Sequence, residues 1–293
     1  MAIPLIEPTI LAQLLVFGLL LGGIYGFTAL GLTIIFGVMD VINVAHGALM
    51  VVGMYTVWHI STAYGVSPFL AIPVAVVLSF ALGVVIYRAT LAPVIEKPAA
   101  SSLVVTLGLL LVITAVVELR FSATPRSLDY EPGSIAVGDI HVLTGQLYAV
   151  LIALAAFVAV WLLLHRTHLG RAIRGTADNR AGAIYVGLNV ARIDYLTFGL
   201  GAALAGLAGA LIPLIQPFDP FLGNQYLTIA FVVVVLGGLG SIPGALLGGL
   251  VIGMIHVFGS FLLPGSAYEI LIFLLFILVL LFKPTGLLGS DSG

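Results

Sequence analysis

The chain has 293 residues, of which 61% are hydrophobic and only 8% are charged. Soluble domains average about 25% charged residues, so this composition excludes an ordinary soluble protein and places the chain in a lipid bilayer. The formal net charge of −2 implies no nucleic-acid partner, and the absence of cysteine excludes disulfides, thiolate metal sites and thiol nucleophiles.

Apolar runs long enough to cross a bilayer recur along nearly the whole chain. Because one span needs about 20 apolar residues, we expect a single all-α polytopic membrane domain over residues 1–293, with eight or nine transmembrane helices. The expected spans are 9–36, 41–60, 68–87, 101–119, 146–165, 195–214, 226–236, 244–262 and 268–282. The first run follows Glu7 without a basic residue and is longer than a signal-peptide core, so we interpret it as a span.

Two of these runs indicate broken helices. The first is too long for one simple crossing, and the seventh is short and ends in "GGLGSIPG" at residues 237–244. Irregular backbone at membrane depth is tolerated only where protein or a cavity covers its polar groups. The number of spans therefore stays open between eight and nine.

The stretch "INVAHG", residues 42–47, places an amide and an imidazole between two apolar runs. In a structural interpretation Asn43 and His46, three residues apart and so on one helical face, hydrogen-bond neighbouring groups or a freed backbone carbonyl, because an unpartnered amide in hydrocarbon is costly. In a functional interpretation the helix breaks near Asp40 and both side chains offer hydrogen bonds to a polar solute. Both interpretations stay open.

A possible internal repeat connects the two interruptions. "FGL", "LTIIF" and "GALM" in the first part are echoed by "FGL", "LTIAF" and "GALL" in the second, although chance agreement is an alternative for such apolar sequence. Paired interrupted helices indicate a substrate route in transporters that descend from duplicated halves. The translocation path is therefore expected to include Asp40, Asn43, His46, Gly47, Gly237, Gly238, Gly240 and Ser241. Elsewhere, Gly18, Gly22 and Gly26 recur every four residues, which is typical of close helix packing.

The distribution of basic residues predicts the orientation. Residues 166–192 contain five of the ten Lys and Arg residues against one Asp, so this loop is expected in the cytoplasm. Residues 88–98 and Lys283 are expected on the same side, and residues 120–143, with two basic and three acidic residues, outside. The N-terminus then lies outside with nine spans and inside with eight.

The cytoplasmic loop is expected to form two short helices, over 172–180 and 180–186, with breaks at Gly175 and Gly187. Its length and its mixture of Arg, Asn, Asp and small residues favour a docking surface for a soluble partner. A solvated face without a partner is the alternative.

Five motifs, in this order, carry a resemblance to a known family. They are "GLTIIFGVMDVINVAHGALMVVGMY", "GRAIRGTADNRAGAIYVGLN", "FGLGAALAGLAGAL", "VVLGGLGSIPGALLGG" and "LLFKPTGLLG", and they run from Gly31 to Gly289. Together they resemble the inner-membrane permease subunits of branched-chain amino acid ABC importers, specifically the shorter of that family's two paralogous permeases.

The resemblance implies a multi-pass subunit in the bacterial inner membrane that carries branched-chain amino acids or related small polar solutes. It implies a paralogous permease subunit, two cytoplasmic ATP-binding subunits and an external solute-binding protein as partners. Residues 166–193 would then couple to the ATPase, with Arg174 and Arg180 reaching acidic or backbone groups and Asp178 and Asn179 capping or orienting the second helix. The expected coupling residues are Gly170, Arg171, Arg174, Gly175, Asp178, Asn179, Arg180 and Gly187.

This chain is expected to be no enzyme and to hold no cofactor or metal. It has no G-x-x-x-x-G-K-[ST] phosphate loop, so ATP would bind to the partner subunits. Ser241 does not fit the G-x-S-x-G pattern of hydrolases, and His165 and His168 are interpreted as interfacial residues rather than metal ligands. A stand-alone secondary transporter or channel is the alternative function, but such carriers place several ionisable residues mid-span, and few occur here.

Overall fold

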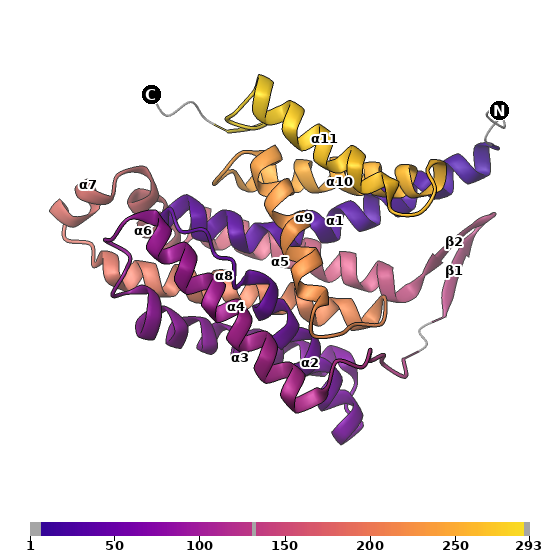
Figure 1. Ribbon diagram of the computed structural model, residues 1–293, viewed down its shortest axis with the longest axis horizontal. Helices are drawn as coiled ribbons and strands as arrows, with labels where there is room; N and C mark the ends of the chain where they lie inside the picture. Colours follow the sequence, from indigo (N-terminus) through magenta and orange to yellow (C-terminus); the bar gives the residue numbers. More distant parts are fainter. Residues whose placement is uncertain (1–6, 131–132, 290–293) are drawn as a thin grey trace.

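The computed structural model describes residues 7–130 and 133–289, and its architecture is almost entirely helical (Figure 1). The helices are α1 (Pro8–Met39), α2 (His46–Tyr64), α3 (Pro68–Ile86), η1 (Tyr87–Leu91), α4 (Ala99–Phe121), α5 (Thr144–Arg166), α6 (His168–Asp178), α7 (Arg180–Tyr185), α8 (Val190–Leu211), η2 (Ile212–Leu214), α9 (Leu222–Gly237), α10 (Ile242–Leu262) and α11 (Ala267–Phe282). Strands β1 (Ser134–Val137) and β2 (Ile140–Leu143) form an antiparallel hairpin between α4 and α5, in which Ser134 pairs with Leu143. This hairpin is not predicted from the sequence.

Each predicted span lies on a helix, which confirms the all-α polytopic class. Within residues 7–130 and 133–289, six helical stretches are long and apolar enough to cross a membrane: α1, α3 with η1, α4, α5, α8 with η2, and α10. The apolar helices α9 and α11 are shorter, and α2 has 19 residues. The long first run is one uninterrupted helix of 32 residues, so the expected break falls after it rather than within it.

The two ends of the molecule carry different structures. Helices α1, α5, α10 and α11 run along the longest axis, with α6 and α7 at one end and the β1–β2 hairpin at the other (Figure 1). By the positive-inside rule we predict that the arginine-rich α6–α7 end lies on the cytoplasmic side. We call the hairpin end the outer end, and α1 begins there.

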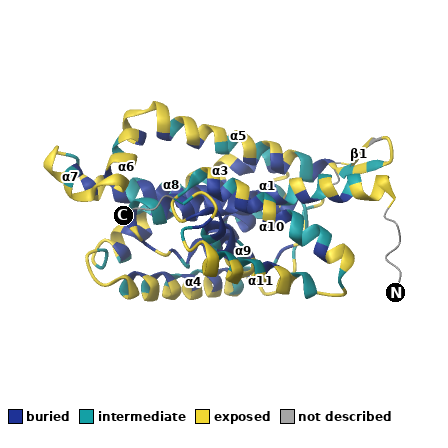
Figure 2. Ribbon diagram, turned by 90° about the horizontal axis from the view of Figure 1, so that it is seen from above, coloured by how far each residue is buried: buried dark blue, intermediate teal, exposed yellow. Residues whose placement is uncertain are grey.

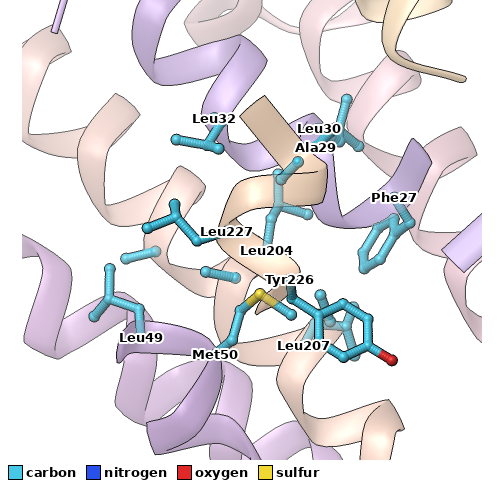
Figure 3. Packing of buried hydrophobic residues seen from close by; sticks show 14 of the residues in the cluster. Phe27, Ala29, Leu30, Leu32, Leu49, Met50, Leu204, Leu207, Tyr226 and Leu227 are labelled. Carbon is cyan, nitrogen blue, oxygen red and sulfur yellow. The ribbon is translucent and has the colours of Figure 1, made fainter. Parts of the chain in front are cut away.

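The core lies where α1, α2, α8 and α9 meet. Helix α8 is buried along most of its length, whereas α4 and α5 present exposed apolar faces suited to lipid (Figure 2). Leu227 of α9 lies among Leu49 and Met50 of α2 and Leu204 of α8 (Figure 3). The expected glycine packing is confirmed on α1, because a Cβ added at Gly18, Gly22 or Gly26 would press against α10.

Candidate functional site

The "INVAHG" stretch joins α1 to α2. Helix α1 ends at Met39, Asp40 adopts a left-handed conformation with φ 52°, and α2 begins at His46. The prediction that Asn43 and His46 share a helical face is wrong, because Asn43 lies in the connection before α2. The break near Asp40 is at the expected position.

His46 lies deep in the bundle and is fully buried. Its Nε2 atom is 2.9 Å from the main-chain oxygen of Thr28. Thr28 stands eleven positions before the end of α1, which corresponds to about 16 Å along the helix axis. The connection after Met39 therefore returns into the bundle before α2 starts.

The neighbours of His46 are closely enclosed. Asn43 is also fully buried, and within the described part of the chain neither polar atom of its side chain has a hydrogen-bond partner. A Cβ on Gly47 would collide with the main chain of Gly223 at the start of α9. This geometry makes the Asn43–Gly47 stretch a packing centre between α1, α2 and α9, and a role for it in translocation stays a prediction.

The second interruption is a tight turn between α9 and α10. Gly238 and Gly240 have φ values of 107° and 79°, which favour glycine, and the Ser241 hydroxyl accepts the Gly244 N–H at 3.2 Å. Ser241 therefore caps α10. The backbone N–H groups of Leu287 and Leu288 donate to the oxygens of Leu236 and Gly237 at 2.8 and 3.0 Å. The chain's last motif thus satisfies carbonyl groups that the end of α9 leaves free.

The end of α1 lies against the turn between α9 and α10. A Cβ placed on Gly37, near the end of α1, would lie 2.9 Å from the Cα of Gly240. His46 bonds a carbonyl far back along α1. The structure therefore brings the end of α1 to the α9–α10 turn, and it places His46 and Gly47 elsewhere.

Two short helices, α6 and α7, follow α5, as the loop pattern predicts. They meet at Asn179, next to the expected junction at Arg180, whereas the expected break at Gly175 is wrong because Gly175 lies inside α6. The side-chain oxygen of Asn179 accepts the Gly182 N–H at 2.7 Å and caps α7. Gly187, with φ 83°, follows α7 as expected, and Gly170 packs tightly against the end of α5.

Arg180 binds within its own chain. Its two terminal nitrogens donate to both carboxylate oxygens of Asp194, at 3.0 and 2.5 Å, and Asp194 is only 1% exposed. The Tyr87 hydroxyl donates to the same carboxylate at 3.3 Å. Hydrogen bonding to Asp194 raises the pKa of the Arg180 guanidinium above its ordinary value. Arg180 therefore reaches an acidic group of its own chain, and a role for it toward a partner stays a prediction.

The remaining coupling residues face outward. Arg171, Arg174 and Asp178 are exposed, and Arg171 donates to the Nδ1 atom of His168 at 2.8 Å. Beside them, Ile184, Tyr185 and Val186 form an apolar tip at the end of α7, with exposures of 59%, 89% and 78%. Sequence reasoning missed this tip, although "AIYVG" is an apolar run within a polar loop.

Sequence reasoning also missed a cavity near the outer end. It has a volume of about 630 Å³ and lies between α1, α9, α10 and α11, next to the start of α5. The polar side chains that line it are Tyr25, Gln146, Gln216, Gln225, Tyr226, Thr228, His256, Tyr268 and Glu269. None of the eight expected path residues lines it. The sequence shows these side chains as single polar residues in apolar runs. Their spacing along the chain does not indicate that they line one cavity.

Hydrogen bonds organise this cavity. The Tyr25 hydroxyl lies 2.8 Å from Nδ1 of His256, and the Gln216 amide donates to the Tyr226 hydroxyl at 3.3 Å. The His256 and Tyr268 rings lie 4.2 Å apart between centroids. Within residues 7–130 and 133–289 no group of three or more His, Asp or Glu side chains is placed to hold a metal ion.

Comparison with known proteins decides the family. The family described as "Branched-chain amino acid transport system / permease component" matches residues 14–280. This chain belongs to that family. It is a multi-pass membrane permease and not an enzyme, as the resemblance implied.

Individual relatives cover nearly the whole permease. The high-affinity branched-chain amino acid transport system permease protein BraD of Pseudomonas aeruginosa is 31% identical over 96% of both chains. The corresponding protein LivH of Escherichia coli K12 is 32% identical over 94% of both. The ribose import permease protein RbsC of Escherichia coli K12 is 29% identical over 68% of this chain and 64% of its own. No solved structure matches this permease.

Proposed function

We propose that this permease is a transmembrane subunit of an ATP-driven importer in a bacterial inner membrane, and that its cargo is a branched-chain amino acid. The functions by which BraD and LivH are named support this cargo over the sugar of the more distant RbsC. In this proposal a paralogous permease completes the membrane unit. Two cytoplasmic ATP-binding subunits supply the energy, and an external solute-binding protein delivers the cargo.

The apolar tip of α7 is the observation that carries the proposal. Helix α7 projects from the arginine-rich end of the molecule (Figure 2), and Ile184, Tyr185 and Val186 are exposed at its end. Water is a poor environment for three neighbouring large apolar side chains, and exposed apolar patches of this kind mark interaction sites. A soluble protein on the cytoplasmic side, with an apolar pocket and acidic groups for Arg171 and Arg174, suits this surface.

The tip is firmly connected to the membrane helices. The Arg180–Asp194 ion pair ties the start of α7 to the first turn of α8, and Tyr87 of η1 bonds the same carboxylate. At Gly170 the start of α6 packs closely against the last turn of α5. A displacement of α7 by a partner would therefore act on α8, on the α3–η1 helix and on α5 together.

Co-purification tests the proposal. Replacing Tyr185 and Val186 by serine should release the ATP-binding subunits from the complex and abolish ATP-dependent uptake of L-leucine. The control is Tyr64→Ser at the opposite end of the molecule, where the side chain is 74% exposed. If the tip variant lacks the ATP-binding subunits but still takes up L-leucine at the wild-type rate, the result would support a stand-alone transporter instead.

A further inference from the structure

Two cavities of different character adjoin near the outer end of the permease. The polar cavity of about 630 Å³ shares Leu21, Ile24, Gln146, Ile215 and His256 with a second cavity of about 460 Å³. The second cavity is lined mainly by apolar side chains, among them Leu14, Phe17, Leu20, Val257 and Phe261. Volumes of this size are typical of sites for small molecules.

One of the side chains that line the polar cavity is a carboxylate, that of Glu269, which is exposed at the start of α11. Glu269 lies in the first turn of α11, a helix that is otherwise apolar. A charged side chain facing hydrocarbon is costly, so ionisable residues in spans face a cavity or a partner group. Among the described residues Glu269 forms no ion pair. Its natural partner in the cavity is a cation.

Buried polar side chains also line this cavity. Tyr25 and Tyr226 are only 3% and 8% exposed, and each directs its hydroxyl into the polar network described above. The side-chain oxygen of Gln146 is buried and has no hydrogen-bond partner among the described residues. A buried acceptor without a partner costs free energy, and Gln146 lies where the two cavities meet.

We propose that the two cavities form one binding site for a zwitterionic amino acid with an aliphatic side chain. Glu269 and the Gln146 oxygen receive the ammonium group, and the amide of Gln225 donates to the carboxylate. The apolar cavity around Leu14, Phe17 and Leu20 holds the aliphatic side chain. The assignment rests on the proposed function for its cargo, but the division into polar and apolar parts comes from the cavities themselves.

Uptake by the complete complex tests the carboxylate. In proteoliposomes with all partner subunits, Glu269→Gln should lower the maximal rate of L-leucine uptake at least tenfold, and Glu269→Asp should retain part of it. Glu118→Gln, near the outer end of α4, is the matched control and should transport normally. A Glu269→Gln complex that assembles and transports at the wild-type rate would overturn the site.

Thiol labelling tests the same site without transport. The chain has no cysteine, so Thr228→Cys introduces a single thiol at the polar cavity. Millimolar L-leucine should slow its labelling by a membrane-impermeant reagent at least threefold, whereas 4-methylpentanoate, which lacks the ammonium group, should not. Labelling that neither compound slows would indicate a lipid-filled or water-filled space and would overturn the site. Protection by L-leucine in a complex that transports no leucine would refute the proposed function alone.

Discussion

The Nε2 atom of His46 lies 2.9 Å from the main-chain oxygen of Thr28, and this contact fastens the start of α2 to the middle of α1. It also accounts for two glycines. A Cβ on Gly31 would lie 2.8 Å from Cε1 of His46, and a Cβ on Gly47 would collide with Gly223. The imidazole and the glycines around it therefore allow α1, α2 and α9 to meet closely.

Replacing His46 tests whether this contact is structural. His46→Leu should destabilise the permease by about 1–2 kcal/mol, because a buried hydrogen bond is lost and the Thr28 carbonyl oxygen no longer has the imidazole as a donor. His46→Gln should retain part of the bond. The thermal midpoint of the purified protein measures both effects, with His141→Leu on the exposed hairpin as the control. Normal stability and assembly combined with lost uptake would favour a role of His46 in the path.

The contact between α1 and α10 predicts a strong effect of side-chain size at Gly22. A Cβ there would lie 2.7 Å from the Cα of Leu250, which is main chain and cannot turn aside. Gly22→Leu should therefore separate the two helices and reduce the amount of folded protein at least fivefold, measured by size-exclusion chromatography. Gly108→Leu on α4 should have little effect, because a Cβ there meets nothing within 4 Å. Equal yields of both variants would contradict the packing.

The sequence predicts the helices well because apolar runs and breaks are local signals. Spans, the break after Asp40 and the Asn179 cap follow from composition and short motifs. The hydrogen bond from His46 to Thr28 and the bond from Arg180 to Asp194 do not, since each depends on how distant helices pack. The same holds for the outer cavity: Tyr25, Tyr226 and His256 stand on three helices, and only the fold shows that they converge.

Reporter fusions test the orientation. A reporter after Gly133, beside the hairpin, should be external, and one after Gly187, behind α7, should be cytoplasmic. Gly187 is the better position than Gly175, because Gly175 lies inside α6. If nine helices cross the membrane, a reporter before α1 should also be external. Reporters at Gly133 and Gly187 on the same side would refute the positive-inside assignment.

The Arg180–Asp194 pair joins the α6–α7 segment to two parts of the permease, α8 and the α3–η1 helix. It is the only ion pair in residues 7–130 and 133–289, and its carboxylate also binds Tyr87. The pKa of Arg180 is raised, so the guanidinium contributes its stabilisation fully below the ordinary arginine pKa and would lose it only in strong alkali. Titration of the Arg180 guanidinium therefore does not break the pair within the physiological pH range.

Breaking the pair should uncouple the segment from the spans. Arg180→Met leaves the buried Asp194 with Tyr87 as its remaining hydrogen-bond donor, and Arg180→Lys keeps the charge but loses the two-pronged geometry. We expect both variants to bind the ATP-binding subunits, since the α7 tip is unchanged, and to hydrolyse ATP. L-leucine uptake per ATP hydrolysed should fall at least fivefold, and it should fall more for Arg180→Met than for Arg180→Lys. Arg166→Met, at the end of α5, is the control, because Arg166 is exposed, forms no ion pair within the described residues and has no part in the proposed docking surface. If that control lost coupling while Arg180→Met kept it, motion of the ATP-binding subunits would reach the spans through α6 and its contact with α5 at Gly170, and not through Asp194.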